Sequence, residues 1–267
     1  MTDADLTEAG ITRRPSINCD CGESWEAFRA GWQAEWLKCA DLANVCCGEH
    51  AGDAGLTRAT FLQVAQYSRR AGAHPGYPDR EHFGRRPLFG TTFRAHDIEE
   101  FVARQVAFAQ TAAREAGLEL YHIKPHGALY NEASAPTDEA GEIAEAIARG
   151  VLLVARDVFL VGLANSQMLN VFRRQGFAVL REAFADRRYG ANGLLVPRSE
   201  ANAILDEEDE VRRQVRTWQD RVDTFCVHGE GPEAGRRLQQ LSALIPALPR
   251  ALPDQTSGRK PSRSGTP

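Results

Sequence analysis

The chain repeats one pattern: a short apolar run, a polar turn that contains glycine, and then a segment with apolar residues at helical spacing. The apolar runs predict seven strands, at residues 16–20, 41–46, 72–74, 118–124, 158–162, 177–180 and 224–228. The helical spacing is clear at Phe61, Leu62 and Ala65. Because strands and helices alternate, the sheet should be mostly parallel. Seven such units in one domain predict a closed or nearly closed β/α barrel, with a doubly wound open sheet as the alternative.

The two ends of the chain lack this pattern. Residues 1–15 have no apolar core and carry acids, so we expect a disordered lead rather than a secretory signal. Residues 249–267 are rich in Pro, Ser, Gly and basic side chains, which predicts a disordered tail. We therefore expect one barrel domain over residues 16–248, since β/α barrels of roughly 200–250 residues are commonly single units.

Composition and charge narrow the class of protein. The hydrophobic fraction of 43% and the charged fraction of 25% are typical of a globular domain. A formal net charge of −4 gives no electrostatic reason to bind nucleic acid or an anionic membrane. No apolar run approaches the roughly 20 residues that cross a bilayer. We expect a cytoplasmic protein that binds neither nucleic acid nor membrane.

The six cysteines are predicted to be reduced thiols that pack in the core, since no export signal accompanies them. Adjacent Cys46 and Cys47 cannot chelate one zinc ion comfortably, and the chain has no C-x-x-C pair. Because side chains alternate along a strand, Cys19 and Cys21 should face the helices while Asn18 and Asp20 face the other way.

Ionisable residues follow the predicted strands closely. They are Asp20 and Glu23; Glu49, His50 and Asp53; His74 and Asp79; Lys124 and His126; Asp186 and Arg187; and His228 and Glu230. In a parallel barrel the carboxyl ends of the strands meet at one rim, where active sites are assembled. A single histidine near a strand end is more often a packing residue, but four of them beside glycine or proline turns favour a site.

The chemistry of these groups suggests roles. We expect Asp20 or a rim histidine to act as general base, and Lys124 and His126 to stabilise developing negative charge. Pro125 keeps Lys124 extended, and a buried lysine requires an anionic partner. Asp20 could instead cap the turn that follows it. No metal is predicted, although a set of Asp20, His50 and His74 would be chemically reasonable.

Several other features bear on function. The chain has no G-x-x-x-x-G-K-[ST] loop for ATP, no G-x-S-x-G elbow and no kinase signature. Residues 206–220 are highly charged, which is typical of a solvated helix. Arg85 and Arg86 lie in a long loop that could close over the rim.

In their order along the chain, eight motifs resemble those of the LamB/YcsF family. They are Asn18–Glu23, Asn44–Asp53, Gly72–Asp79, Phe83–Arg86, Lys124–Asn131, Phe184–Tyr189, Leu195–Arg198 and Cys226–Glu230. The order holds from about residue 16 to about residue 246. Three features depart from the family pattern: Glu49 replaces a phenylalanine, Glu230 replaces an aspartate, and the segment between Arg198 and Asp223 is shorter. We expect Glu49 to place an extra carboxylate beside His50.

The resemblance implies a deformed seven-stranded β/α barrel, similar to the glycoside hydrolase/deacetylase superfamily. It implies hydrolysis of a cyclic amide C–N bond, in which the lactam of 5-oxoproline opens to give L-glutamate. The reaction would consume ATP and require partner subunits B and C. Because this chain lacks a recognisable nucleotide loop, we assign phosphorylation of the lactam to those partners. Alternatives are a metal-dependent amide hydrolase or polysaccharide-deacetylase-like enzyme that acts without ATP, or a non-catalytic substrate-binding subunit.

These motifs supply the residues expected at the site. The catalytic candidates are Asp20, His50, His74, Lys124 and His126. The substrate-binding candidates are Asn18, Glu23, Asn44, Asp53, Arg85, Asp186, Arg187, Arg198 and His228. Spacing alone leaves open which group is acid and which is base.

Overall fold

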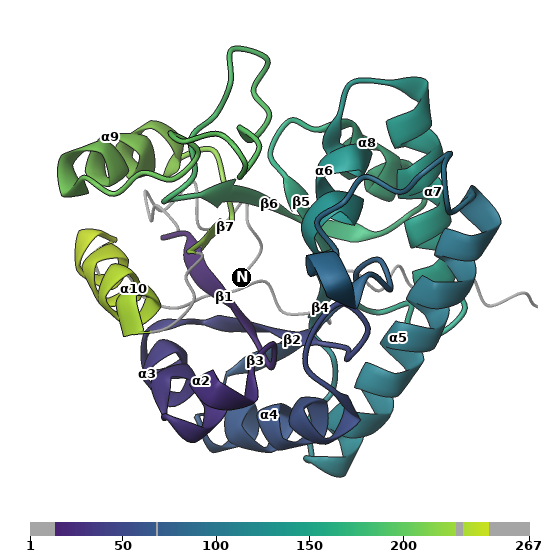
Figure 1. Ribbon diagram of the computed structural model, residues 1–267, viewed down its shortest axis with the longest axis horizontal. Helices are drawn as coiled ribbons and strands as arrows, with labels where there is room; N and C mark the ends of the chain where they lie inside the picture. Colours follow the sequence, from purple (N-terminus) through teal and green to yellow (C-terminus); the bar gives the residue numbers. More distant parts are fainter. Residues whose placement is uncertain (1–13, 68, 228–231, 246–267) are drawn as a thin grey trace, which may run out of the picture.

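The computed structural model describes residues 14–67, 69–227 and 232–245. Within these residues, seven parallel strands pair in chain order and form a closed barrel (Figure 1). The strands are β1 (Ser16–Cys21), β2 (Leu42–Cys46), β3 (Arg70–His74), β4 (His122–Ile123), β5 (Phe159–Leu163), β6 (Ala178–Phe184) and β7 (Thr224–Cys226). Strand β7 pairs with β1 from Ser16 opposite Thr224, which closes the ring. The predicted barrel is confirmed, and the open-sheet alternative is wrong.

Helices surround the barrel, as Figure 1 shows. They are α2 (Trp25–Arg29), α3 (Trp32–Cys39), α4 (Ala54–Gln66), α5 (Ala95–Glu115), α6 (Gly127–Ser134), α7 (Asp138–Leu152), α8 (Gln167–Arg174), α9 (Glu208–Trp218) and α10 (Pro232–Leu244), with a 3₁₀ turn η1 (Arg80–His82) after β3. Several begin at a side-chain cap, as at Thr137 before α7 and Ser166 before α8. Helix α9 is the charged helix expected near residues 206–220, and its buried residue is Val215.

Alternation along the strands separates an apolar shell from a partly polar barrel interior. Ile17, Cys19 and Cys21 lie in the core between the sheet and the helices. Asn18, on the opposite face of β1, reaches across the barrel and donates to Glu182 Oε1 of β6 and Thr224 Oγ1 of β7. A second apolar cluster, separate from the main core, consists of Leu42, Tyr121, Phe159, Val161 and Leu180. Leu42 precedes Asn44 in β2 and Leu180 precedes Glu182 in β6, so the interior becomes polar toward the carboxyl ends of these strands.

One glycine makes room inside the barrel. Gly72 of β3 pairs with His122 of β4, and a Cβ atom at position 72 would lie 2.3 Å from His122 Nε2. The absent side chain therefore leaves the space that the buried imidazole occupies. His122 Nε2 donates to Asn44 Oδ1 at 2.7 Å.

Apart from Arg14 and Pro15, the predicted lead 1–15 lies outside the described residues, as does the whole predicted tail 249–267. Arg14 donates to Asp41 Oδ2 at 3.2 Å and so holds the entry to β1 against the start of β2. No helix in the described part of the chain is both long and apolar enough to cross a membrane.

Candidate functional site

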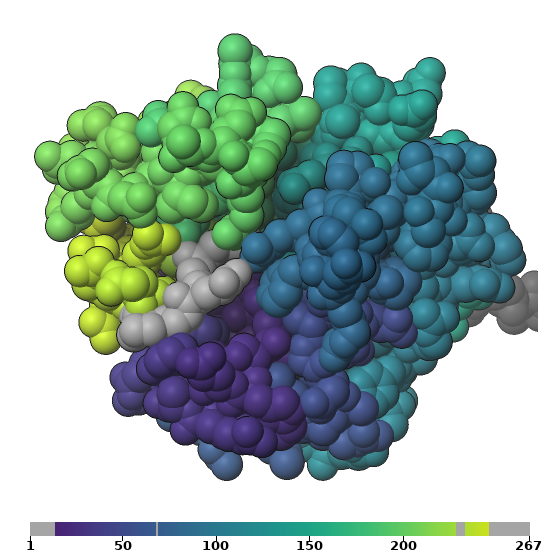
Figure 2. All heavy atoms as spheres, in the orientation of Figure 1, coloured from purple at the N-terminus to yellow at the C-terminus, as the bar shows by residue number. Residues whose placement is uncertain are grey.

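A cavity of about 630 Å³ opens at the carboxyl ends of the strands. Its lining includes eight of the predicted site residues: Asp20, Glu23, His74, Arg85, Lys124, His126, Arg187 and Arg198. The loop between β3 and α5 contributes Phe83, Arg85 and Pro87 to the wall. Figure 2 shows this loop as the blue segment across the face of the barrel, next to the green segment that follows β6. The long loop predicted to close over the rim does so.

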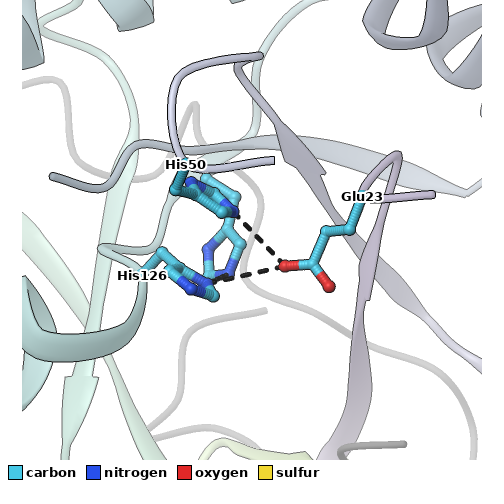
Figure 3. A group of neighbouring side chains, drawn as sticks. Glu23, His50 and His126 are labelled. Atoms are coloured by element: carbon cyan, nitrogen blue, oxygen red, sulfur yellow. Dashed lines mark hydrogen bonds and ion pairs between the residues drawn. The ribbon is translucent and has the colours of Figure 1, made fainter. Parts of the chain in front are cut away.

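Glu23, His50, His74 and His126 form one group, which we call the histidine cluster. Each residue follows or ends a strand, and their side-chain ligand atoms all lie within 4.8 Å of one another. Glu23 Oε1 lies 3.3 Å from His50 Nε2 and 3.5 Å from His126 Nδ1 (Figure 3). His126 Nδ1 lies 3.0 Å from His74 Nε2. The rings of His50 and His126 stack with centroids 3.7 Å apart. The strand-end argument thus correctly predicted that these side chains converge.

Backbone carbonyls determine which ring nitrogens carry hydrogen in two of these histidines. His74 Nδ1 lies 2.7 Å from the carbonyl oxygen of Lys124, and His126 Nε2 lies 2.9 Å from that of Phe83. A carbonyl oxygen only accepts, so both of these nitrogens donate. In the neutral rings the other nitrogens, His74 Nε2 and His126 Nδ1, therefore carry lone pairs and face each other.

The buried histidines favour the neutral form. Burial lowers the pKa of His50 and of His126 well below the usual value, and the neighbouring histidines lower both further. Burial, and then the charge of Lys124, lowers the pKa of His122 to about 3. His50 Nδ1 is buried and has no hydrogen-bond partner among the described residues. A proton is therefore not readily held in this region at neutral pH.

Lys124, Asn18, Asp20, Glu182 and Cys226 form a second group, the lysine cluster. Lys124 Nζ lies 3.1 Å from Asp20 Oδ1, 3.1 Å from Glu182 Oε1 and 3.1 Å from Asn18 Oδ1. It also lies 3.0 Å from Cys226 Sγ. Burial alone would lower the pKa of Lys124, but Asp20, Cys226 and Glu182 outweigh burial and raise it. The anionic partner that a buried lysine requires is therefore provided by two carboxylates of the protein itself.

Asp20 connects the two clusters. Its Oδ1 accepts from Lys124 and, at 2.8 Å, from Asn44 Nδ2, while its Oδ2 lies 3.4 Å from His74 Nε2. Asn44 also donates to Asn18 Oδ1 at 2.8 Å. Asn18 and Asn44 are buried and do not line the cavity. Asn44 holds Asp20 directly, and Asn18 holds Asn44 and Lys124, so both support the site rather than contact a bound molecule.

Three arginines gather on another wall of the cavity. Burial, and then Arg198, lowers the pKa of Arg187 to about 10, while burial and Arg85 lower that of Arg198. Arg187 donates to the carbonyl oxygen of Val196 at 2.6 Å, which holds its guanidinium at the rim. Closely spaced, partly desolvated guanidinium groups attract an anion, since carboxylate and phosphate match their geometry.

Other predicted site residues lie elsewhere. Asp53 caps α4, where its Oδ1 accepts from Leu56 N at 2.9 Å and its Oδ2 from Trp25 Nε1 at 2.7 Å. Asp186 Oδ2 lies 3.7 Å from Arg237 Nη1 and is not among the cavity-lining residues. His228 lies outside the described residues.

Of the two residues that depart from the family pattern, Glu230 lies outside the described residues, and Glu49 pairs with the surrounding helix α5. Its Oε1 accepts from Arg104 Nε of α5 at 3.1 Å. The expectation of an extra carboxylate beside His50 is therefore wrong, because an arginine of the surrounding helix binds that carboxylate instead.

The sequence interpretation missed two members of the lysine cluster. The predicted sixth strand ended at Leu180, but β6 continues to Phe184, and alternation from Leu180 brings Glu182 into the barrel. Cys226 was expected only to pack, yet its thiol contacts Lys124. Burial raises the pKa of Cys226 and of Cys46, and that of Cys47 to about 12, so all three are thiols.

Residues 16–251 match the family model described as the LamB/YcsF family. The chain belongs to this family. It is 37% identical over 235 residues to the A subunit of 5-oxoprolinase from Pyrococcus horikoshii, a match that covers 83% of this chain and 89% of that protein. It is 39% identical over 232 residues to the A subunit of 5-oxoprolinase from Tolumonas auensis, covering 82% of this chain and 90% of that one.

A solved structure agrees with the family assignment and the barrel. The crystal structure of the lactam utilization protein from Thermus thermophilus has a TM-score of 0.76 and 29% sequence identity to this chain. It covers 87% of this chain and 96% of its own. The resemblance drawn from the eight motifs is thereby confirmed.

Proposed function

We propose that this chain is the A subunit of an ATP-dependent 5-oxoprolinase. With partner subunits B and C it would hydrolyse the cyclic amide C–N bond of 5-oxoproline and release L-glutamate. The observation that carries this proposal is that charged residues from the family motifs, which lie far apart in sequence, line one cavity at the barrel mouth. Relatives that are 37% and 39% identical to this chain over the aligned residues bear the name of the A subunit of 5-oxoprolinase.

The cavity suits a small anionic substrate. 5-Oxoproline has a carboxylate and a neutral lactam, and Arg85, Arg187 and Arg198 provide the cationic wall that a carboxylate or phosphoryl group would contact. The volume of about 630 Å³ lies in the usual range for small-molecule sites and leaves room for a phosphorylated form of the lactam. Phe83, Tyr130 and Phe184 offer apolar surface for the ring.

The cavity also has the groups that water attack requires. In the proposed reaction, water adds to the carbonyl carbon while a neighbouring base takes its proton. Asp20 is the leading candidate for this base, because Lys124 and Asn44 hold it at the edge of the cavity. The ring C–N bond then breaks, and the nitrogen takes a proton to leave as the amine. From the phosphorylated lactam this gives an acyl phosphate, which a second water hydrolyses to the side-chain carboxylate of glutamate and inorganic phosphate.

ATP is assigned to the partners. A lactam is an unreactive amide, and phosphorylation of its oxygen makes the carbon easier to attack and the oxygen easier to expel. This chain has no P-loop motif. We therefore expect the isolated chain to hydrolyse ATP no faster than background.

The histidine cluster favours a second candidate function, that of a metal-dependent amide hydrolase that acts without ATP. Glu23, His50, His74 and His126 would hold the ion, which would supply Lewis acidity at the substrate carbonyl. A substrate-binding subunit without catalytic groups is the third possibility, and the density of acid and base groups in the cavity disfavours it.

The test is glutamate release from 5-oxoproline, measured for the chain alone, with ATP, and with both partner subunits present. We expect turnover only in the complete mixture. Asp20→Asn should lower kcat by about 100-fold or more, as expected for loss of a general base. Arg198→Gln should raise the KM for 5-oxoproline, whereas Arg58→Gln, which changes an exposed arginine on α4, should alter neither constant.

Each outcome of this test separates the candidates. ATP-independent release by the chain alone would establish the metal-dependent hydrolase instead. Full turnover by the complete complex with Asp20→Asn would remove Asp20 from the chemistry and favour a binding role for this chain.

A further inference from the structure

We propose that the histidine cluster binds one divalent transition-metal ion, for which Zn²⁺ fits the donors well. The ligand atoms would be Glu23 Oε1, His50 Nε2, His74 Nε2 and His126 Nδ1. This inference concerns the cavity of the proposed function but does not depend on the reaction assigned to it.

The first reason is the contact between two lone pairs. His74 Nδ1 and His126 Nε2 both donate to carbonyl oxygens, so His74 Nε2 and His126 Nδ1 face each other as acceptors at 3.0 Å. Two acceptors at this distance repel unless a cation lies between them. Asp20 Oδ2 at 3.4 Å from His74 Nε2 and Glu23 Oε1 at 3.5 Å from His126 Nδ1 place two further acceptor oxygens beside the same pair of nitrogens. A metal ion between the rings would be bound by both lone pairs.

The second reason is the size of the cluster. Zn–N bonds of about 2.0–2.1 Å and Zn–O bonds of about 2.0–2.2 Å place neighbouring ligand atoms about 3.0–3.5 Å apart, depending on the bond angle. The contacts of 3.0 Å between His74 and His126, 3.3 Å between Glu23 and His50, and 3.5 Å between Glu23 and His126 match these ligand–ligand edges.

The third reason is the way the rings are held. Metal-binding histidines almost always donate their other ring N–H to a carbonyl or carboxylate, which orients the ring. His74 and His126 both do so. The covering loop also packs closely on the cluster, since a Cβ atom at Gly84 would lie 2.9 Å from His50 Cβ and 3.2 Å from His126 Cδ2. His74 and His126 are therefore oriented before any ion binds, and the loop packs closely against His50.

The donor set also points to a class of ion. Three imidazoles and one carboxylate suit zinc and its transition-metal neighbours better than Mg²⁺ or Ca²⁺, which prefer oxygen ligands. This set of ligands differs from the possible metal-binding set that the sequence suggested, which was Asp20, His50 and His74. The Oδ1 of Asp20 is already bound by Lys124 and Asn44, whereas Glu23 lies against two of the histidines.

The experiment measures metal binding directly, with no substrate, ATP or partner chain. Tag-free full-length protein is stripped with a chelator and dialysed, and its Zn²⁺ content and affinity are measured by mass spectrometry and competition with a chromophoric chelator. We expect about one Zn²⁺ per chain and a higher Tm with Zn²⁺ than without it, because an ion that binds only the folded state stabilises it. The Co²⁺-loaded protein should show d–d bands without a thiolate charge-transfer band, since no cysteine is a proposed ligand.

Two ligand variants and one control complete the test. Glu23→Gln and His126→Gln should each weaken Zn²⁺ binding by at least about 10-fold. Glu23 is the safer variant for folding, because its side chain is 20% exposed. His96→Gln removes a histidine that is 77% exposed on α5 and should bind Zn²⁺ like the unaltered chain. Substoichiometric Zn²⁺, or equal affinity in Glu23→Gln and the unaltered chain, would overturn the proposal. A chain that binds Zn²⁺ as expected but releases no glutamate with its partners would instead refute the proposed function alone.

Discussion

The two polar clusters at the barrel mouth are adjacent and similarly buried, but their charges are balanced differently. In the lysine cluster a full cation lies 3.1 Å from each of two carboxylates. In the histidine cluster neutral nitrogens and one carboxylate lie close together, and two lone pairs face each other. The first cluster pairs its cation with carboxylates of the protein and can hold the site in shape. The second gains most from a bound cation, so the proximity of polar groups alone does not distinguish scaffold from binding site.

The largest effect that separates the clusters is expected from Lys124→Met. Removing the ammonium leaves Asp20 and Glu182 without their cation inside the barrel, which should lower the free energy of unfolding by about 3–5 kcal/mol. Urea denaturation measures this loss. Lys38→Met is the matched control, because that lysine pairs with Glu35 at the surface and should have little effect. Unchanged stability in Lys124→Met would mean that the lysine cluster is not a structural unit.

The two clusters should also respond to pH in opposite ranges. The pKa values of His50, His126 and His122 are lowered by burial, so the unfolded chain binds protons that the folded chain does not. Their contribution to stability is complete above the ordinary value of 6.5 and is lost as the pH falls below it, by about 1.4 kcal/mol per pH unit for each histidine. Lys124 has a raised pKa, so its contribution is complete below 10.5 and is lost only as the pH rises past its folded pKa.

Urea midpoints between pH 8 and pH 5, taken in a chelator so that metal loss adds nothing, measure the histidine contribution. A midpoint that stays constant from pH 7 to pH 5 would contradict the assignment of neutral, buried histidines.

One thiol lies beside the histidine cluster and one belongs to the lysine cluster, and replacing them should have smaller effects. Cys46 Sγ lies 3.4 Å from His50 Nε2, and Cys226 Sγ lies 3.0 Å from Lys124 Nζ. Replacing either by alanine removes one small buried group and should cost about 1 kcal/mol. Glutamate release by the complete complex should remain within a factor of about ten of the original rate, because neither thiol is a proposed nucleophile. Complete inactivation of a folded Cys46→Ala chain would show that this thiol takes part in the chemistry.

The smallest effect is expected at Asp53, which belongs to neither cluster. Asp53→Ala removes the cap of α4 and should lower the Tm slightly, whereas Asp53→Asn keeps a capping side chain and should not. Both variants should leave KM and kcat for glutamate release unchanged. A raised KM in both would return Asp53 to the substrate-binding residues.

The sequence was most informative where a residue's place depends on its own strand. Asp20, His74, Lys124 and His126 converge because each lies at or just after a strand end, and a parallel barrel brings those ends together. Glu182 was missed because the apolar pattern of its strand stops at Leu180, where Arg181 interrupts it. The buried carboxylate of Glu182 can be explained only from the structure, in which Lys124, the residue after β4, lies beside it.

The least predictable features depend on contacts between distant loops. The carbonyl oxygen of Phe83 sets the tautomer of His126, but nothing in the local sequence indicates that the loop after β3 reaches that ring. Likewise Asp53 follows a predicted strand and was therefore expected at the rim. The structure shows instead that it caps helix α4, which begins at Ala54. The surroundings of His126 and of Asp53 are set by the paths of the neighbouring loops and helices, which residue type alone does not reveal.

The packing of Gly72 against His122 has a consequence for the family's evolution. Because the imidazole fills the space that a side chain at position 72 would need, the two positions share one volume. A change at either site constrains the other, so they should vary together among relatives. Chains with alanine or a larger residue at position 72 should have a smaller side chain at position 122, and chains with histidine there should keep glycine.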